Sequence, residues 1–140
     1  MDVRVQRRIA APPSAVARVM FEPENDPRWI GGAKAVQRLT PGPLALGSRV
    51  RRDGGFMGRK FHWVTEVAEL APERRLAMRF AEGPMKGGVT YEIAPDDGGA
   101  LVSIRNHGGA SFAFPGLTWM LRRSVAKDLE RLEGLVLAGA

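Results

Sequence analysis

The stretch from residue 115 to residue 137 reads PGLTWMLRRSVAKDLERLEGLVL. Its apolar side chains recur at intervals of three or four residues, the spacing that places them on one face of an α-helix. They are Leu117, Leu121, Val125, Leu129, Leu132 and Val136. Charged residues of both signs occupy the other side of the same helix. The pattern therefore predicts a long C-terminal helix whose apolar face packs against another layer, in preference to a helix that rests on a membrane.

The residues before this helix predict an antiparallel sheet. Segments with strand-like alternation are separated by short connections rich in glycine, proline and aspartate, which favour tight turns. The predicted strands are 3–9, 34–39, 48–53, 59–70, 75–81, 88–93 and 100–107. Because short connections join antiparallel neighbours, the last six strands should form a meander.

Two short helices are predicted after the first strand. Consecutive prolines begin a helix over 13–21, since proline is tolerated in a first turn, and Asp26 is expected to cap a second helix over 26–29. A seven-stranded antiparallel sheet twists and curves, and the long helix must bury its apolar face against it. Residues 1–140 are therefore expected to form one α+β domain, a helix-grip fold with the curved sheet wrapped around the C-terminal helix.

Composition and charge exclude several classes of function. The chain has 140 residues and no cysteine, which excludes disulfides, a thiol nucleophile and cysteine metal sites. Its net charge is +6, but the cations are dispersed and match no recognised motif, so no specific nucleic-acid partner is expected. The chain contains neither a secretory signal nor a segment long enough to span a bilayer. A cytoplasmic protein is expected.

Short motifs distributed along the chain point to a family. They are Ile9-Ala10-Ala11-Pro12, Pro27-Arg28-Trp29, Gly47-Ser48-Arg49-Val50 and VAELAPERRL at 67–76. With the predicted order of elements, nearly the whole chain resembles the START-like superfamily, also called SRPBCC, particularly its polyketide cyclase/dehydrase-like members. The chain departs from the family pattern at Ala17, where an aromatic residue is common, and at Ala100, where threonine is common. The resemblance implies a cavity that binds lipids, sterols or polyketides, but it does not imply a reaction.

Strand alternation predicts which side chains face such a cavity. The predicted ligand-binding residues on the strands are Arg59, Phe61, Trp63, Met78, Phe80, Tyr91, Ile104 and Asn106. Those outside the strands are Trp29, Phe112, Trp119 and Met120. Phe112, Phe114, Phe56 and Met85 are expected to surround the cavity mouth, because they are apolar residues in predicted connections. The alternative is that the apolar strand faces simply pack together as core.

Polar residues on the inward strand faces are the catalytic candidates. Tyr91, Asn106 and Arg59 each carry a donor that could stabilise a carbonyl or enolate oxygen. Arg52 would join them if Val50 faces inward. Alternatively, both arginines lie at strand ends in water, and Asn106 bonds to backbone in the following turn.

Other catalytic arrangements find little support. Alternation places both histidines, His62 and His107, on the outer face, and no metal site or hydrolytic triad is predicted. Asp128 lies at the edge of the helix's apolar face and is expected to pair with Arg131, three residues on. The glycine-rich segments 54–58 and 83–88 match no nucleotide-binding motif and are interpreted as turns, so no cofactor is expected.

The predicted function is the binding of a small hydrophobic ligand, partly polar or anionic, between the sheet and the C-terminal helix. Two alternatives remain open. One is a cyclase- or dehydratase-type enzyme that uses the same cavity. The other is a protein-interaction module that presents its aromatic surface to a partner. The expected partner is a small hydrophobic molecule, and the expected oligomeric state is a monomer or a homodimer.

Overall fold

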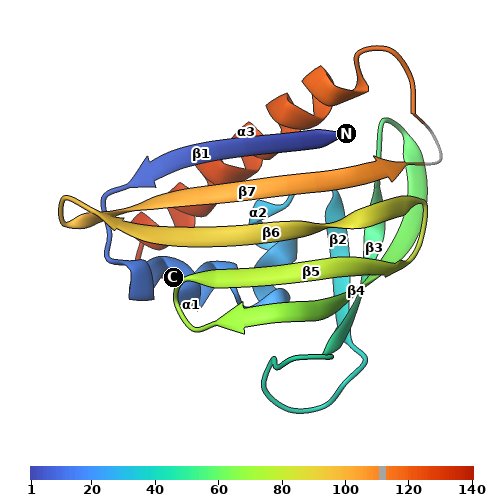
Figure 1. The fold of residues 1–140 in the computed structure, drawn as a ribbon. Helices are drawn as coiled ribbons and strands as arrows, with labels where there is room; N and C mark the ends of the chain where they lie inside the picture. Colours follow the sequence, from blue (N-terminus) through green and yellow to red (C-terminus); the bar gives the residue numbers. More distant parts are fainter. Residues whose placement is uncertain (111–112) are drawn as a thin grey trace.

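The computed structural model describes residues 1–110 and 113–140 (Figure 1). Within them the strands are β1 (Asp2–Ile9), β2 (Ala33–Arg38), β3 (Arg49–Phe56), β4 (Arg59–Ala71), β5 (Arg75–Glu82), β6 (Met85–Asp96) and β7 (Gly99–Ala110). The helices are α1 (Pro13–Met20), α2 (Asp26–Trp29) and α3 (Leu117–Leu137), with a 3₁₀ turn, η1 (Pro23–Asn25), before α2. No helix in this described part of the chain is long and apolar enough to cross a membrane.

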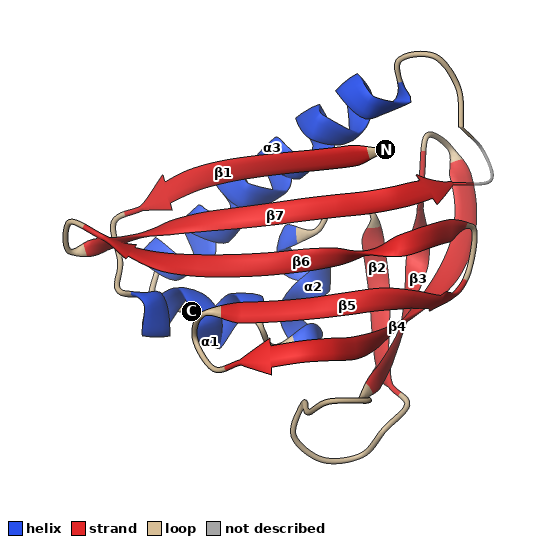
Figure 2. Ribbon diagram, in the orientation of Figure 1, coloured by secondary structure: helices blue, strands red, loops and turns tan. Residues whose placement is uncertain are grey.

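The strands form one antiparallel sheet in the order β1-β7-β6-β5-β4-β3-β2. Consecutive strands from β2 to β7 are neighbours, and β1 pairs with β7 along its whole length. All three helices lie on the same face of the curved sheet, and α3 crosses behind it (Figure 2). The predicted helix-grip α+β fold is therefore confirmed, including the meander and the two short helices after the first strand.

Strand β6 begins three residues earlier than predicted, because glycines interpreted as a turn lie inside it. Gly87 pairs with Gly108 of β7, and both have positive φ angles, 91° and 110°. A Cβ atom on Gly87 would lie only 2.1 Å from the carbonyl oxygen of His107. Only glycine tolerates this backbone conformation and this close approach. The glycines therefore lengthen the β6–β7 pair as far as Met85 and Ala110.

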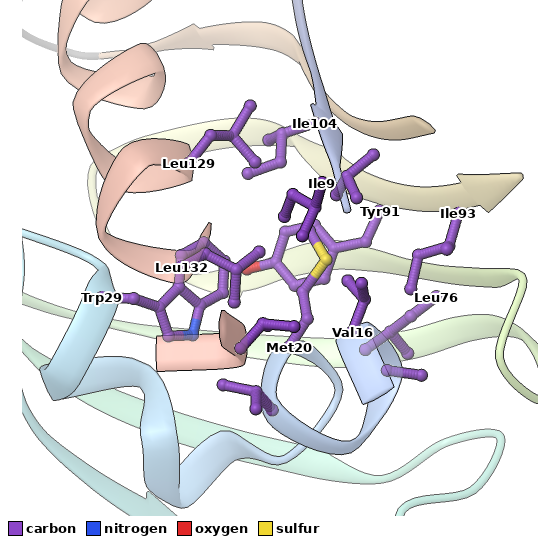
Figure 3. Close-up of a cluster of buried hydrophobic side chains, with 14 of the residues drawn as sticks. Ile9, Val16, Met20, Trp29, Leu76, Tyr91, Ile93, Ile104, Leu129 and Leu132 are labelled. Carbon is purple, nitrogen blue, oxygen red and sulfur yellow. The ribbon is translucent and has the colours of Figure 1, made fainter. Parts of the chain in front are cut away.

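The core lies between the sheet and the helices. The apolar stripe of α3 packs there with residues of β1, β6 and β7, and Leu129 and Leu132 are completely buried. Figure 3 shows both leucines among side chains contributed by the sheet and by α1, including Ile9, Tyr91 and Met20. The predicted role of the C-terminal stripe is thus confirmed. Helix α3 begins at Leu117, because the preceding Gly116 has a left-handed conformation with φ of 87°.

Arg7 interrupts the apolar face of β1, and its position at the sheet edge explains why. Strand β1 is an edge strand, and its pairing with β7 has no bulge. The Arg7 guanidinium donates hydrogen bonds to Glu133 of α3, the shorter of them at 2.9 Å. A polar residue is therefore accommodated where the strand edge meets the side of α3.

Replacing Leu132 by alanine tests the packing of α3. Truncation of a completely buried leucine should lower the free energy of unfolding by about 2–5 kcal/mol, because it removes apolar contacts and leaves a void. The control is Glu130→Ala on the exposed face of the same helix, which should change stability by about 0.5 kcal/mol or less. Urea denaturation of the two variants measures both values. Equal midpoints would contradict the placement of α3.

Candidate functional site

A cavity of about 190 Å³ lies between the concave face of the sheet and the N-terminal half of α3. Strands β3 to β7 supply most of its wall, and α2 and α3 supply the rest. The apolar lining consists mainly of Phe61, Trp63, Met78, Phe80, Val89, Ile104, Leu117, Leu121 and Val125. Phe61 and Trp63 are in ring contact, with centroids 5.6 Å apart. The wall is therefore rich in aromatic rings and thioethers, as ligand pockets usually are.

Most of the predicted residues border the cavity. Those that line the cavity are Trp29, Phe61, Trp63, Met78, Phe80, Tyr91, Ile104 and Asn106. Their roles in binding or catalysis stay predictions. Phe112 lies outside the described residues.

Three of the predicted residues are not part of the lining. Arg59 is exposed at the start of β4. For this arginine, the alternative of a position at a strand end in water is the correct one. Trp119 is 63% exposed and stacks with Arg123, whose guanidinium carbon lies 5.6 Å from the ring centroid. Met120 is only half-buried. Trp119 is two residues from both leucines that α3 contributes to the cavity, and two residues span about 200° of a helix, so it points away from them.

The opening of the cavity is marked by exposed residues of its lining. These are Met1, Lys86 and His107, and the predicted rim residues Phe56 and Met85 lie in the same lining. Phe114 is exposed and does not reach it. Alternation predicted that His107 faces outward. Its Nε2 lies 3.3 Å from the position of a Cβ atom on Gly88, and Gly88 alternates with Val89, which lines the cavity, so the ring lies on the outer face of the sheet as predicted.

Arg52 provides a buried charge in the cavity wall. Val50 is buried, so Arg52 also faces inward, and only 4% of it is exposed. Its Nε donates to Asp26 Oδ2 over 2.5 Å, and its Nη1 donates to Thr65 Oγ1 over 2.7 Å. The alternative that Arg52 lies in water is therefore wrong. Thr65 was missed, although it alternates with Trp63 and could have been found by the same reasoning.

Asp26 has a different role from the predicted one. The N-cap residue of α2 is Asn25, and Asp26 is the first helical residue. Its carboxylate is buried and accepts the hydrogen bond from Arg52, because a buried guanidinium requires a partner of opposite charge. The ion pair ties α2 to β3.

Tyr91 lies in the same lining and is 5% exposed. Its ring is 5.7 Å from that of Trp29, and its hydroxyl has no hydrogen-bond partner among the described residues. Burial raises the pKa of Tyr91, the charges of Asp26 and Asp128 raise it further, and Arg52 opposes them. The hydroxyl is consequently protonated at neutral pH and is available as a donor.

Asp128 of α3 contributes a buried carboxylate to the lining. Its Oδ1 accepts hydrogen bonds from the Gly31 amide over 3.0 Å and from Arg131 Nη2 over 2.5 Å. The predicted pairing with Arg131 is therefore confirmed, whereas the contact with Gly31 was not anticipated. Burial raises the pKa of Asp128, and both hydrogen bonds oppose that shift.

A comparison with known protein families identifies the family of this chain. The family model described as polyketide cyclase / dehydrase and lipid transport matches residues 1–136. The chain belongs to this family. A search of the curated proteins finds no match.

Solved structures show the same fold as this polyketide cyclase/dehydrase family member. TTHA0849 from Thermus thermophilus is 23% identical with a TM-score of 0.84, over 100% of this chain and 99% of that chain. CV1439 from Chromobacterium violaceum is 24% identical with a TM-score of 0.72, over 96% of each chain. An AHSA1-like protein from Aeromonas hydrophila is 16% identical with a TM-score of 0.72, over 99% of this chain and 93% of that chain.

The cavity of this family member offers hydrogen-bonding groups but no metal-binding cluster. Across residues 1–110 and 113–140, no group of three histidine, aspartate or glutamate side chains is placed to hold a metal ion. The polar residues in the lining are the arginine, tyrosine, threonine and aspartate described above, Asn106 and Ser124, and the exposed Lys86 and His107. Such an arrangement can orient a ligand oxygen by hydrogen bonding.

The Asp26–Arg52 pair is expected to be important for stability. Asp26→Asn leaves the Arg52 charge buried without its counter-ion, which should cost about 3–5 kcal/mol in free energy of unfolding. Asp53→Asn is the matched control, because Asp53 pairs with Arg51 on the same strand at an exposed site. That change should cost about 1 kcal/mol or less. Similar urea midpoints for the two variants would show that the buried pair has no special role.

Proposed function

We propose that this protein binds a small hydrophobic molecule in the cavity between the sheet and α3. The observation that carries the proposal is the unfilled space of about 190 Å³ against an aromatic wall. Protein interiors are densely packed, and voids larger than a water molecule are few. A space of this size, with an apolar lining and a few polar groups, is typical of a ligand pocket. The family description, which includes lipid transport, supports the same function.

Two alternatives, a purely structural core and a protein-interaction module, fit the structure less well. If the apolar strand faces served only as core, Phe61 and Trp63 would meet side chains of α3 rather than border a cavity. A protein-interaction module would display its aromatic residues on the surface. Phe61, Trp63 and Phe80 instead belong to the lining, and Trp63 is buried.

A cyclase- or dehydratase-type enzyme is the second candidate. The observation that favours it is the presence of two donors in the lining, the Tyr91 hydroxyl and the Arg52 guanidinium. Donors aimed at a developing enolate oxygen lower the barrier of such reactions. Arg52 takes the role first assigned to Arg59, which lies outside the lining. If a bound polyketide-like compound is converted, Tyr91→Phe should abolish turnover while leaving the compound bound, as measured by product chromatography and by binding.

Binding should depend on Trp63 and not on Trp119. Native mass spectrometry of the freshly purified protein should detect a bound small molecule. Small aromatic compounds should change tryptophan emission with micromolar affinity, because Trp29 and Trp63 line the cavity. Trp63→Ala should weaken binding of all of them, since it removes much of the apolar contact area. Trp119→Ala is the matched control and should leave affinity unchanged.

Two results would contradict binding in this cavity. One is that no compound alters emission or the unfolding midpoint, and that no small molecule copurifies. The other is that both tryptophan variants lose affinity equally, which would move the site to the outer surface near Trp119.

A further inference from the structure

We propose that the cavity selects an uncharged ligand of one or two rings whose carbonyl-type oxygen points inward, toward Arg52 and Tyr91. This inference rests on the proposed binding function and specifies the chemical class of the ligand. It is carried by the size of the cavity, by two unused hydrogen-bond donors and by the charges around them.

The volume indicates the size of the ring system that the cavity can hold. An apolar cavity of about 150 Å³ is large enough to hold benzene. The cavity described here measures about 190 Å³. It is therefore large enough to hold one or two rings. The aromatic pair Phe61 and Trp63 and the thioether of Met78 offer ring faces and edges that suit an aromatic ligand.

Two of the donors in the wall, on Arg52 and Tyr91, have no partner among the described residues. Arg52 uses Nε and Nη1 for Asp26 and Thr65, which leaves Nη2 without an acceptor in the described part of the chain. The Tyr91 hydroxyl likewise has no acceptor there. Neither of these two atoms is fully enclosed by protein, and both residues are more than nine-tenths buried and line the cavity. Because an unpaired donor in an apolar site is unfavourable, a ligand oxygen that accepts from them should bind preferentially.

The surrounding charges favour a neutral acceptor over an anion. The charge of Arg52 is already balanced by Asp26 at 2.5 Å. Asp128 contributes a carboxyl group to the cavity lining, and the charges of Asp26 and Asp128 both act on the Tyr91 hydroxyl. A ligand carboxylate would bring a further negative charge beside them and away from water, which is unfavourable. A ketone oxygen accepts the same hydrogen bonds without a net charge. The sequence left a partly polar and an anionic ligand open, and this inference selects the partly polar, uncharged one.

Three naphthalene compounds of similar shape test the inference. They are 2-acetylnaphthalene, with a ketone; 2-isopropenylnaphthalene, in which a CH₂ group replaces the ketone oxygen; and 2-naphthoate, an anion. The ketone should bind about fivefold or more tightly than the alkene, since it gains at least one neutral hydrogen bond. It should also bind more tightly than the carboxylate at pH 7.5. Dissociation constants come from tryptophan emission and calorimetry with the full chain.

Variants identify the donors. Tyr91→Phe removes one hydroxyl and should weaken binding of the ketone about fivefold, while affinity for the alkene changes less than about twofold. Thr90→Val is the control. It removes a hydroxyl from the residue directly before Tyr91, and Thr90 is not in the cavity lining. The double variant Asp26→Leu with Arg52→Met replaces the ion pair by apolar side chains, an exchange that folded proteins often tolerate. It should reduce the preference for the ketone, and the Tyr91 hydroxyl should account for what remains.

The outcomes separate this inference from the proposed function. If the ketone and the alkene bind equally, or if 2-naphthoate binds most tightly, the cavity still binds small molecules, but the inference is wrong. It is also wrong if Tyr91→Phe weakens both uncharged compounds by the same factor. If none of the three compounds binds, both the proposed function and the inference fail. Unfolding midpoints of every variant confirm that it is folded.

Discussion

The structure depends on how one amphipathic helix is buried against a curved sheet. The C-terminal half of α3 packs tightly, and Leu129 and Leu132 have no exposed surface. The N-terminal half, with Leu117, Leu121 and Val125, borders the cavity instead. The same apolar stripe therefore has two roles. It fixes the helix against the core at one end and provides an apolar wall at the other, so the fold can bind a ligand without opening its core.

The interior of the cavity is not uniformly apolar, and this has an energetic consequence. Burying Arg52 is unfavourable unless its charge and its donors are satisfied, and Asp26 and Thr65 satisfy only part of them. The ion pair also joins α2 to β3, so the short helix that carries Trp29 is held beside the cavity. The same guanidinium group therefore holds α2 against β3 and belongs to the cavity lining.

Membership of the polyketide cyclase/dehydrase and lipid-transport family specifies the fold more narrowly than the ligand. The solved structures that resemble this chain are less than 25% identical to it, so their side chains give little guide to its cavity. What distinguishes one cavity from another is its volume and the position of a few polar groups. In this chain those groups are Arg52, Tyr91 and Asp128, which belong to three separate elements.

The sequence by itself determined the helix-grip fold and the inward face of most strands. Hydrophobic periodicity is a local property, and the spacing of leucines in 117–132 or of Phe61 and Trp63 can be read without knowing the partners. Alternation also predicted that Arg52 faces inward, on the condition that Val50, two residues before it, does so. The predictions failed at Arg59, which is exposed at the start of β4, and at Trp119 and Met120 of α3, which lie outside the cavity lining.

Only the tertiary structure decided which polar groups meet. Asp26 and Arg52 are separated by 26 residues, and Gly31 and Asp128 by 97 residues, so no local pattern indicates either contact. Asp26 had the local features of a helix cap, but the need of a distant buried guanidinium determined its role. The volume of the cavity is likewise a property of the assembled layers. It depends on the curvature of the sheet and the position of α3, and these follow from the sum of many long-range contacts.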